Sequence, residues 1–126
     1  PVAFKRSLGR GKPGDISMLW PTLEETVVTL RGAGGIAVLA HPLDYKMTAT
    51  RLRALTRAFA DAGGEAIEVI NGRPRAGDTD TLWRLVKEHD LCVSVGSDFH
   101  RDTTYGAGLG IDIAHIPEGF GVWERL

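Results

Sequence analysis

Three short apolar segments, separated by longer stretches with helical spacing, set the pattern of the chain. The apolar segments are IAVLA at 36–40, AIEVI at 66–70 and LCVSV at 91–95, and a polar or glycine-bearing loop follows each of them. Short runs rich in β-branched residues and bounded by such loops are typical of strands buried in a parallel sheet. The pattern therefore predicts three parallel strands.

The stretches between and before these segments predict three amphipathic helices. Residues 22–25 form a capping box at the start of the first helix, Thr48 or Thr50 caps the second, and Asp78 or Thr79 opens the third. Each helix has a stripe of apolar residues that we expect to be buried: Leu23, Val27 and Leu30 in the first, Leu52, Leu55, Phe59 and Ala62 in the second, and Leu82, Leu85 and Val86 in the third.

The resulting alternation of helix and strand is typical of a parallel α/β sheet or barrel. The 126 residues suffice for one domain, but three strands are too few to close a barrel. The chain also starts at Pro1 and not at a methionine. We therefore expect it to be part of a longer protein. After residue 100 the alternation is lost, and one short strand is predicted at 110–114.

Composition narrows the function mainly by exclusion. Hydrophobic residues make up 43% and charged residues 25% of the chain, as in ordinary globular proteins. The 15 Lys and Arg residues against 16 Asp and Glu residues leave a net charge of −1, which predicts no stable binding of double-stranded DNA and no attraction to membranes. The single cysteine, Cys92, cannot form an internal disulfide, which favours a cytoplasmic location.

Residues that could bind metal ions follow two of the predicted strands. His41 follows the first strand, and Asp98 and His100 follow the third. Because ligands of α/β folds bind at the carboxyl ends of parallel strands, we expect these side chains to share one mouth. Asp98 and His100 are two residues apart, so extended backbone would point both to the same side, and Pro42 would keep His41 out of a helix. An ordinary role stays open for each, as a capping or surface residue.

Two further groups of polar residues are candidates for phosphate contacts. The basic, glycine-rich stretch at 5–12 contains Arg10 and Lys12, whose charges could pair with phosphate oxygens. This stretch lacks the spacing of a Walker loop. Asn71 and Arg73 follow the second predicted strand and could also contact the substrate. A solvated basic loop and a plain Asn-Gly turn are the alternatives.

The other histidines and the cysteine have no clear chemical role. His89 and His115 lack partners at ligand spacing, so both are expected at the surface or in caps. Cys92 lies within a predicted strand, where we expect it to be buried and unreactive.

Three motifs occur in order along the chain: GIAVLAHP at 35–42, GEAIEVIN at 64–71 and VGSDFH at 95–100. Together they resemble the polymerase and histidinol phosphatase (PHP) family of metal-dependent phosphoesterases. The segment at 4–13 is similar to an LxxGKP stretch in the bacterial branch of that family that acts on nucleotides and short RNA. The resemblance implies the C-terminal portion of a single PHP domain, with a basic loop region at 1–20, βα units at 21–100 and a tail at 101–126.

The resemblance also implies a fold and a mechanism. The fold would be part of a distorted (βα)7 barrel with a cluster of divalent metal ions (manganese, zinc or iron). His41 would bind the third metal, and Asp98 and His100 would bind the first two, one each. A metal-bound hydroxide would attack the phosphorus of a nucleotide phosphate or short RNA, as in a 3',5'-bisphosphate nucleotidase or a 5'-3' exoribonuclease.

The family's remaining ligands, including its His-x-His motif and bridging Glu, have no counterpart here. Since the chain holds only three of roughly nine ligands, we expect it to be inactive and largely metal-free by itself. An open half-barrel exposes sheet edges, so we also expect a dimer. Two other interpretations stay open: a non-catalytic α/β domain with a structural or partner-binding role, and another barrel hydrolase of the amidohydrolase kind.

Overall fold

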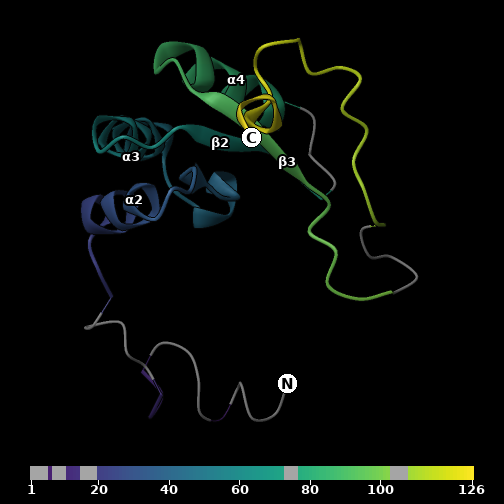
Figure 1. The fold of residues 1–126 in the computed structure, drawn as a ribbon. Helices are drawn as coiled ribbons and strands as arrows, with labels where there is room; N and C mark the ends of the chain where they lie inside the picture. The colour runs from purple at the N-terminus through teal and green to yellow at the C-terminus, as the bar shows by residue number, and fades with distance from the viewer. Residues whose placement is uncertain (1–5, 7–10, 15–19, 73–76, 103–107) are drawn as a thin grey trace.

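The computed structural model describes residues 6, 11–14, 20–72, 77–102 and 108–126. Three parallel strands form one sheet in the order β1–β2–β3, with helices before and between them, so the protein is a mixed α/β fold (Figure 1). The elements in chain order are α2 (Leu23–Gly32), β1 (Val38–Leu39), the 3-10 helix η2 (Pro42–Tyr45), α3 (Ala49–Asp61), β2 (Ala66–Asn71), α4 (Asp78–Glu88), β3 (Cys92–Gly96) and the 3-10 helix η3 (Val122–Arg125). The predicted alternation of helix and strand is confirmed.

The helices begin where local capping signals lie. At α2 the Thr22 hydroxyl accepts from the Glu25 N–H at 3.1 Å, and the Glu25 carboxylate accepts from the Thr22 N–H at 2.8 Å. Thr48 caps α3 by accepting from the Arg51 N–H at 3.3 Å. Helix α4 begins at the predicted Asp78, but its N-cap is Gly77 and not a residue with a capping side chain.

One apolar core joins the sheet to the helices. Helix α2 packs beside α3, and α4 packs against β2. The buried apolar residues of the core are Val27, Ala37, Leu39, Leu52, Phe59, Ile67, Val69, Ile70, Leu82, Leu85, Val86, Leu91 and Val93. No helix in the part of the chain that the structure describes is long and apolar enough to cross a membrane.

Several predictions of detail are wrong. Leu30 is 46% exposed, because α2 buries only Val27. The first strand is shorter than predicted: β1 has two residues because it lies at the sheet edge and pairs only with β2. No strand forms at 110–114, where the Asp112 carboxylate instead accepts from the Ala114 N–H at 2.9 Å and makes a local turn.

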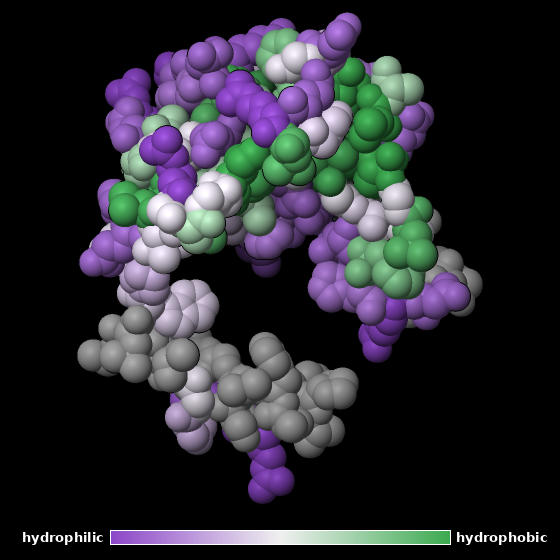
Figure 2. Space-filling view, viewed as in Figure 1, coloured by the Kyte–Doolittle hydropathy of each residue, from purple (hydrophilic) through white to green (hydrophobic). Residues whose placement is uncertain are grey.

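The two edges of the sheet differ. At the outer edge of β3, Val93 forms a parallel bridge with Gly121, and its N–H donates to the Phe120 carbonyl at 2.8 Å. The C-terminal segment thus returns to β3 (Figure 1). At the outer edge of β1 no described residue pairs with the strand, and Val38 is exposed. Apolar residues also lie at the surface of the body between hydrophilic ones (Figure 2).

Candidate metal and phosphate site

The candidate ligands follow the two outer strands of the sheet, at the same edge. His41 lies two residues after β1, Asn71 is the last residue of β2, and Asp98 lies two residues after β3. Because all three strands are parallel, their carboxyl ends meet at one edge of the sheet, with β2 between the other two. The topology thus places these residues along one edge of the sheet.

His41 is held in an unusual backbone conformation. Its φ and ψ of 31° and 53° are left-handed, and the 3-10 helix η2 begins at the next residue, Pro42. The His41 peptide N–H donates to Oε2 of Glu68 at 2.6 Å. The imidazole lies edge-on to the Tyr45 ring, with 5.8 Å between centroids, and the Tyr45 hydroxyl donates to the Ala40 carbonyl at 2.7 Å. Two hydrogen bonds therefore fix the bend after β1: one from the His41 peptide to Glu68, and one from the Tyr45 hydroxyl to the Ala40 carbonyl.

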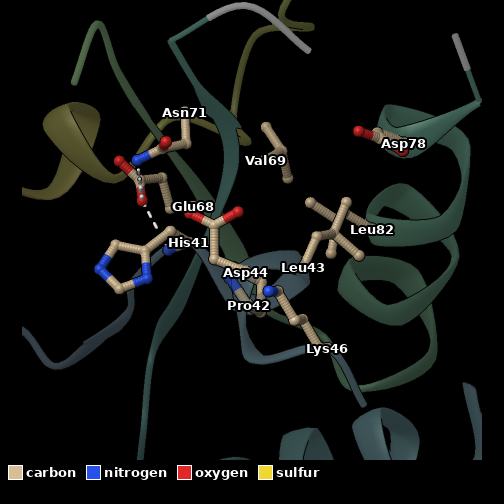
Figure 3. A pocket seen from close by; sticks show the side chains of 10 residues that line it. All are labelled: His41, Pro42, Leu43, Asp44, Lys46, Glu68, Val69, Asn71, Asp78 and Leu82. Atoms are coloured by element: carbon tan, nitrogen blue, oxygen red, sulfur yellow. Dashed lines mark hydrogen bonds between the residues drawn. The ribbon is translucent and has the colours of Figure 1, made fainter. Parts of the chain in front are cut away.

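Glu68 lines the same site and was not singled out by sequence reasoning. It lies in β2, and its Oε2 also accepts from the Asn71 side-chain amide at 3.3 Å (Figure 3). The negative charge of Glu68 reaches Tyr45: burial raises the pKa of the Tyr45 hydroxyl, and the charges of Glu68 and Asp44 raise it further. The sequence signal that could have identified Glu68 is that it is the one acidic residue in the apolar run at 66–70.

Asp98 and His100 lie together, although not through extended backbone as predicted. Asp98 has a φ of 52°, and its carbonyl oxygen lies 2.8 Å from Nδ1 of His100. A carbonyl can only accept, so Nδ1 of His100 carries a proton in this contact. The Asp98 carboxylate is 3.7 Å from the same Nδ1, and the two side chains are 48% and 78% exposed, respectively. An imidazole binds a metal ion through a ring nitrogen that carries no proton, so Nε2 is the nitrogen of His100 available for that role.

The structure brings together two of the three predicted ligands. Within the described ranges, no three His, Cys, Asp or Glu side chains gather closely enough to hold a metal ion. His41 therefore shares the sheet edge with Asp98 and His100 but does not complete a three-ligand group with them.

A cavity of about 500 Å³ opens beside His41. Polar groups of His41, Glu68 and Asn71 lie toward one side of it (Figure 3). Apolar side chains from η2, β2 and α4 form another part of its wall. The lining residues are His41, Pro42, Leu43, Asp44, Lys46, Glu68, Val69, Asn71, Asp78 and Leu82. The cavity thus offers both hydrogen-bonding groups and apolar surface next to a candidate ligand.

Of the two candidates for phosphate contacts that the structure describes, Asn71 and Lys12, Asn71 lines this cavity. Arg10 and Arg73 lie outside the described residues. Lys12 is exposed in a turn at 11–14 and does not line the cavity.

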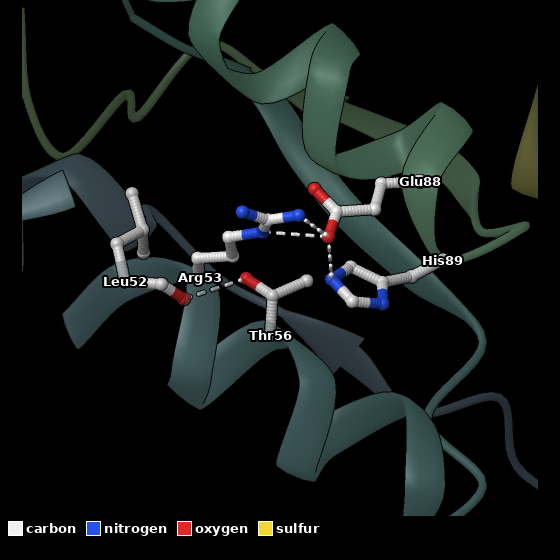
Figure 4. Close-up of polar contacts among 5 residues, drawn as sticks. All are labelled: Leu52, Arg53, Thr56, Glu88 and His89. Atoms are coloured by element: carbon white, nitrogen blue, oxygen red, sulfur yellow. Dashed lines mark hydrogen bonds and ion pairs between the residues drawn. The ribbon is translucent and has the colours of Figure 1, made fainter. Parts of the chain in front are cut away.

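The residues set aside as non-functional behave in different ways. Cys92 is buried as predicted, and burial raises the pKa of its thiol. His115 is exposed. His89 is the C-cap of α4, in line with the expected capping position, and its side chain is only 9% exposed. Its Nε2 lies 3.8 Å from Glu88, whose carboxylate accepts from Arg53 at 2.6 Å (Figure 4).

The chain is similar to bacterial hydrolytic enzymes. No protein-family model matches it. It is 37% identical over 124 residues to a 5'-3' exoribonuclease of Haemophilus influenzae, covering 98% of this chain and 45% of the relative. It is 40% identical over 125 residues to a 3',5'-nucleoside bisphosphate phosphatase of Chromobacterium violaceum, covering 99% and 44%. The 5'-3' exoribonuclease Rnm of Escherichia coli K12 is 37% identical over 122 residues, with 96% and 41% covered.

A solved structure is also similar. It is an amidohydrolase from Chromobacterium violaceum with bound sulfate and no metal, which matches with a TM-score of 0.73 and 36% identity over 98% of this chain and 43% of that one. The chain therefore spans less than half the length of the proteins it matches. These similarities fit a PHP-type phosphoesterase.

Proposed function

We propose that this chain is the C-terminal portion of a PHP domain in a longer protein, here called the parent protein. The parent protein hydrolyses phosphoric esters of nucleotides or short RNA with the help of divalent metal ions. The observation that carries this proposal is the position of His41, Asp98 and His100 after parallel strands that end at one edge. The names of the relatives, exoribonuclease and nucleoside bisphosphate phosphatase, support the same class of reaction.

The proposed fold of the parent protein is a distorted (βα)7 barrel. The outer edge of β3 is bridged to Gly121, whereas no described residue pairs with the outer edge of β1. The match to 43% of a solved amidohydrolase chain supports further strands in the parent protein. Those strands would continue the sheet from β1, which would also cover Val38.

The donor atoms fit a transition metal but are too few for a complete site. Imidazole nitrogen and carboxylate oxygen suit manganese, zinc and iron, and Nδ1 of His100 contacts the Asp98 carbonyl, so Nε2 is the nitrogen that would bind an ion. His41 would bind one ion, and Asp98 and His100 would bind the other two, with the remaining ligands supplied by the rest of the parent protein. Metal ions bound there would activate water and neutralise charge on the phosphate.

Other residues of this chain would hold the phosphate. Asn71 donates one amide hydrogen to Glu68, which leaves its second amide hydrogen for a phosphate oxygen. Arg10, Lys12 and Arg73 would supply positive charge, since Arg and Lys pair with phosphate oxygens.

A specific observation favours phosphate over amide chemistry. The solved neighbour holds sulfate, a tetrahedral dianion of the same shape as phosphate. The name amidohydrolase keeps amide hydrolysis as the second candidate.

The test is an assay of the parent protein with manganese. We expect release of inorganic phosphate from a nucleoside 3',5'-bisphosphate or shortening of a 5'-phosphorylated RNA, and no hydrolysis of simple amides. Asp98→Asn and His100→Gln should each lower kcat/KM by at least about 100-fold, because each removes a metal ligand. His115→Gln, which changes an exposed histidine, is the matched control. Amide hydrolysis, or full activity of Asp98→Asn, would refute the proposal.

A further inference from the structure

Glu68 reaches the ends of all three strands. Its Oε2 accepts from the His41 peptide N–H at 2.6 Å and from the Asn71 amide at 3.3 Å (Figure 3). On the other side, a Cβ added at Gly96, the last residue of β3, would lie 2.8 Å from Oε1. The half-buried carboxylate on the middle strand therefore accepts hydrogen bonds from His41, which lies two residues after β1, and from Asn71 at the end of β2. It also packs against Gly96 at the end of β3.

The hydrogen bond from His41 is the shorter of the two that Glu68 accepts, and it bears on the backbone of His41. A non-glycine residue adopts left-handed backbone only at a cost, so neighbouring groups must hold His41 in it. The contact to Glu68 spans 27 residues of sequence and is short, as expected for a hydrogen bond to a charged carboxylate. It fixes the peptide of His41 against the middle strand.

The bare backbone at Gly96 makes the third contact possible. Because Oε1 of Glu68 occupies the place that a side chain at 96 would need, the carboxylate sits directly against β3. Asp98 follows two residues later. Glu68 therefore contacts the loop that carries His41 and lies against the strand that leads to Asp98 and His100.

We propose that Glu68 is a positioning residue, which holds His41 in place for its metal ion and couples the two ligand-bearing loops. The inference rests on the proposed function for the assignment of His41 to a metal. The rival role is that of a direct metal ligand. The two roles differ in what they need: positioning needs a hydrogen-bond acceptor at 68, whereas ligation needs the negative charge.

The test compares four variants of the parent protein. Glu68→Gln keeps an acceptor of the same shape, and Glu68→Ala removes it. Gly96→Ala keeps the carboxylate but pushes on it from β3, and Gly32→Ala, where a Cβ meets nothing within 4 Å, is the control. The measurements are the amide proton shift of His41 by NMR in the metal-free protein, the dissociation constant of Mn²⁺, and kcat and KM.

We expect the His41 amide proton to lie far downfield in the wild type and in Gly32→Ala, and to move upfield in Glu68→Ala and Gly96→Ala. In Glu68→Ala, Mn²⁺ binding should weaken by roughly 10- to 100-fold, with kcat reduced and KM little changed. Glu68→Gln should stay within about 3-fold of the wild type in Mn²⁺ binding, because its amide oxygen still accepts from His41. If Glu68→Ala does not fold, the comparison of Glu68→Gln and Gly96→Ala with the wild type decides between positioning and direct ligation.

Two results would overturn the inference. One is an unchanged His41 amide shift and Mn²⁺ affinity in Glu68→Ala, or, where that variant does not fold, in Gly96→Ala. The other is a loss in Glu68→Gln as large as in Glu68→Ala, which would indicate direct ligation. Failure of the proposed function is recognised separately: the wild-type parent protein would then lack phosphoesterase activity, while the His41 amide shift would still report the contact with Glu68.

Discussion

Because Asp98 has left-handed backbone, we predict that glycine at this position gives a more stable protein than alanine does, the reverse of the usual order. Asp98 has a φ of 52°. Left-handed backbone costs an L-residue about 1–2 kcal/mol, which glycine avoids, while glycine loses about 0.5–1 kcal/mol more conformational entropy on folding than alanine. The difference is about 0.5–1 kcal/mol in favour of glycine. Asp98→Gly should therefore be more stable than Asp98→Ala by that amount. Both variants lack the carboxylate, so the comparison isolates the backbone.

The assay is urea unfolding of the two variants, with their free energies of unfolding compared at equal slope. Ala54 is the control, because it is exposed in the middle of α3, where Ala54→Gly should destabilise by about 1 kcal/mol. The same comparison at His41, with its φ of 31°, should again favour glycine. If Asp98→Ala were as stable as Asp98→Gly while Ala54→Gly behaved as expected, the strain at this loop would be refuted.

Three further predictions concern the core, the thiol and the isolated chain. Gly64→Ala should destabilise by about 1–3 kcal/mol, because its Cβ would overlap the ring of the buried Phe59; thermal unfolding measures this, with Gly32→Ala as the harmless comparison. Burial raises the pKa of the Cys92 thiol, so the folded state favours the neutral form, and stability present at neutral pH should decline as pH rises above about 9, the usual pKa of the thiol. Cys92→Ala should remove that part of the alkaline decline in urea unfolding. The 126-residue chain alone should show no manganese-dependent phosphatase activity, and robust turnover would contradict the shortage of ligands.

The sequence was most informative where local signals decide the structure. The capping box at 22–25 sets the start of α2, and the apolar runs at 66–70 and 91–95 correspond to β2 and β3 within one residue. A strand buried on both faces needs apolar residues at every position, so its pattern can be read without knowing its neighbours.

The details that were missed depend on contacts between distant residues. The conformation of His41 is tied to Glu68, which lies 27 residues away, so no local pattern indicates it. The length of β1 is limited by its place at the sheet edge, and the burial of His89 depends on how the end of α4 meets its surroundings. Asp98 and His100 were paired by assuming extended backbone, whereas a left-handed turn brings them together.

The Asp98–His100 pair contributes little to the stability of the fold. Both side chains are largely exposed, and exposed pairs of this kind contribute about 0–1 kcal/mol to stability. Asp98 also lies in left-handed backbone, which aspartate adopts more readily than most residues but less readily than glycine. Of the four non-glycine residues with positive φ in the described part of the chain, two are His41 and Asp98. Backbone strain of this kind gathers at sites that bind or react, and here it falls on the two loops that follow β1 and β3. For the metal site that we propose, such backbone would hold the ligand-bearing residues in place before an ion binds.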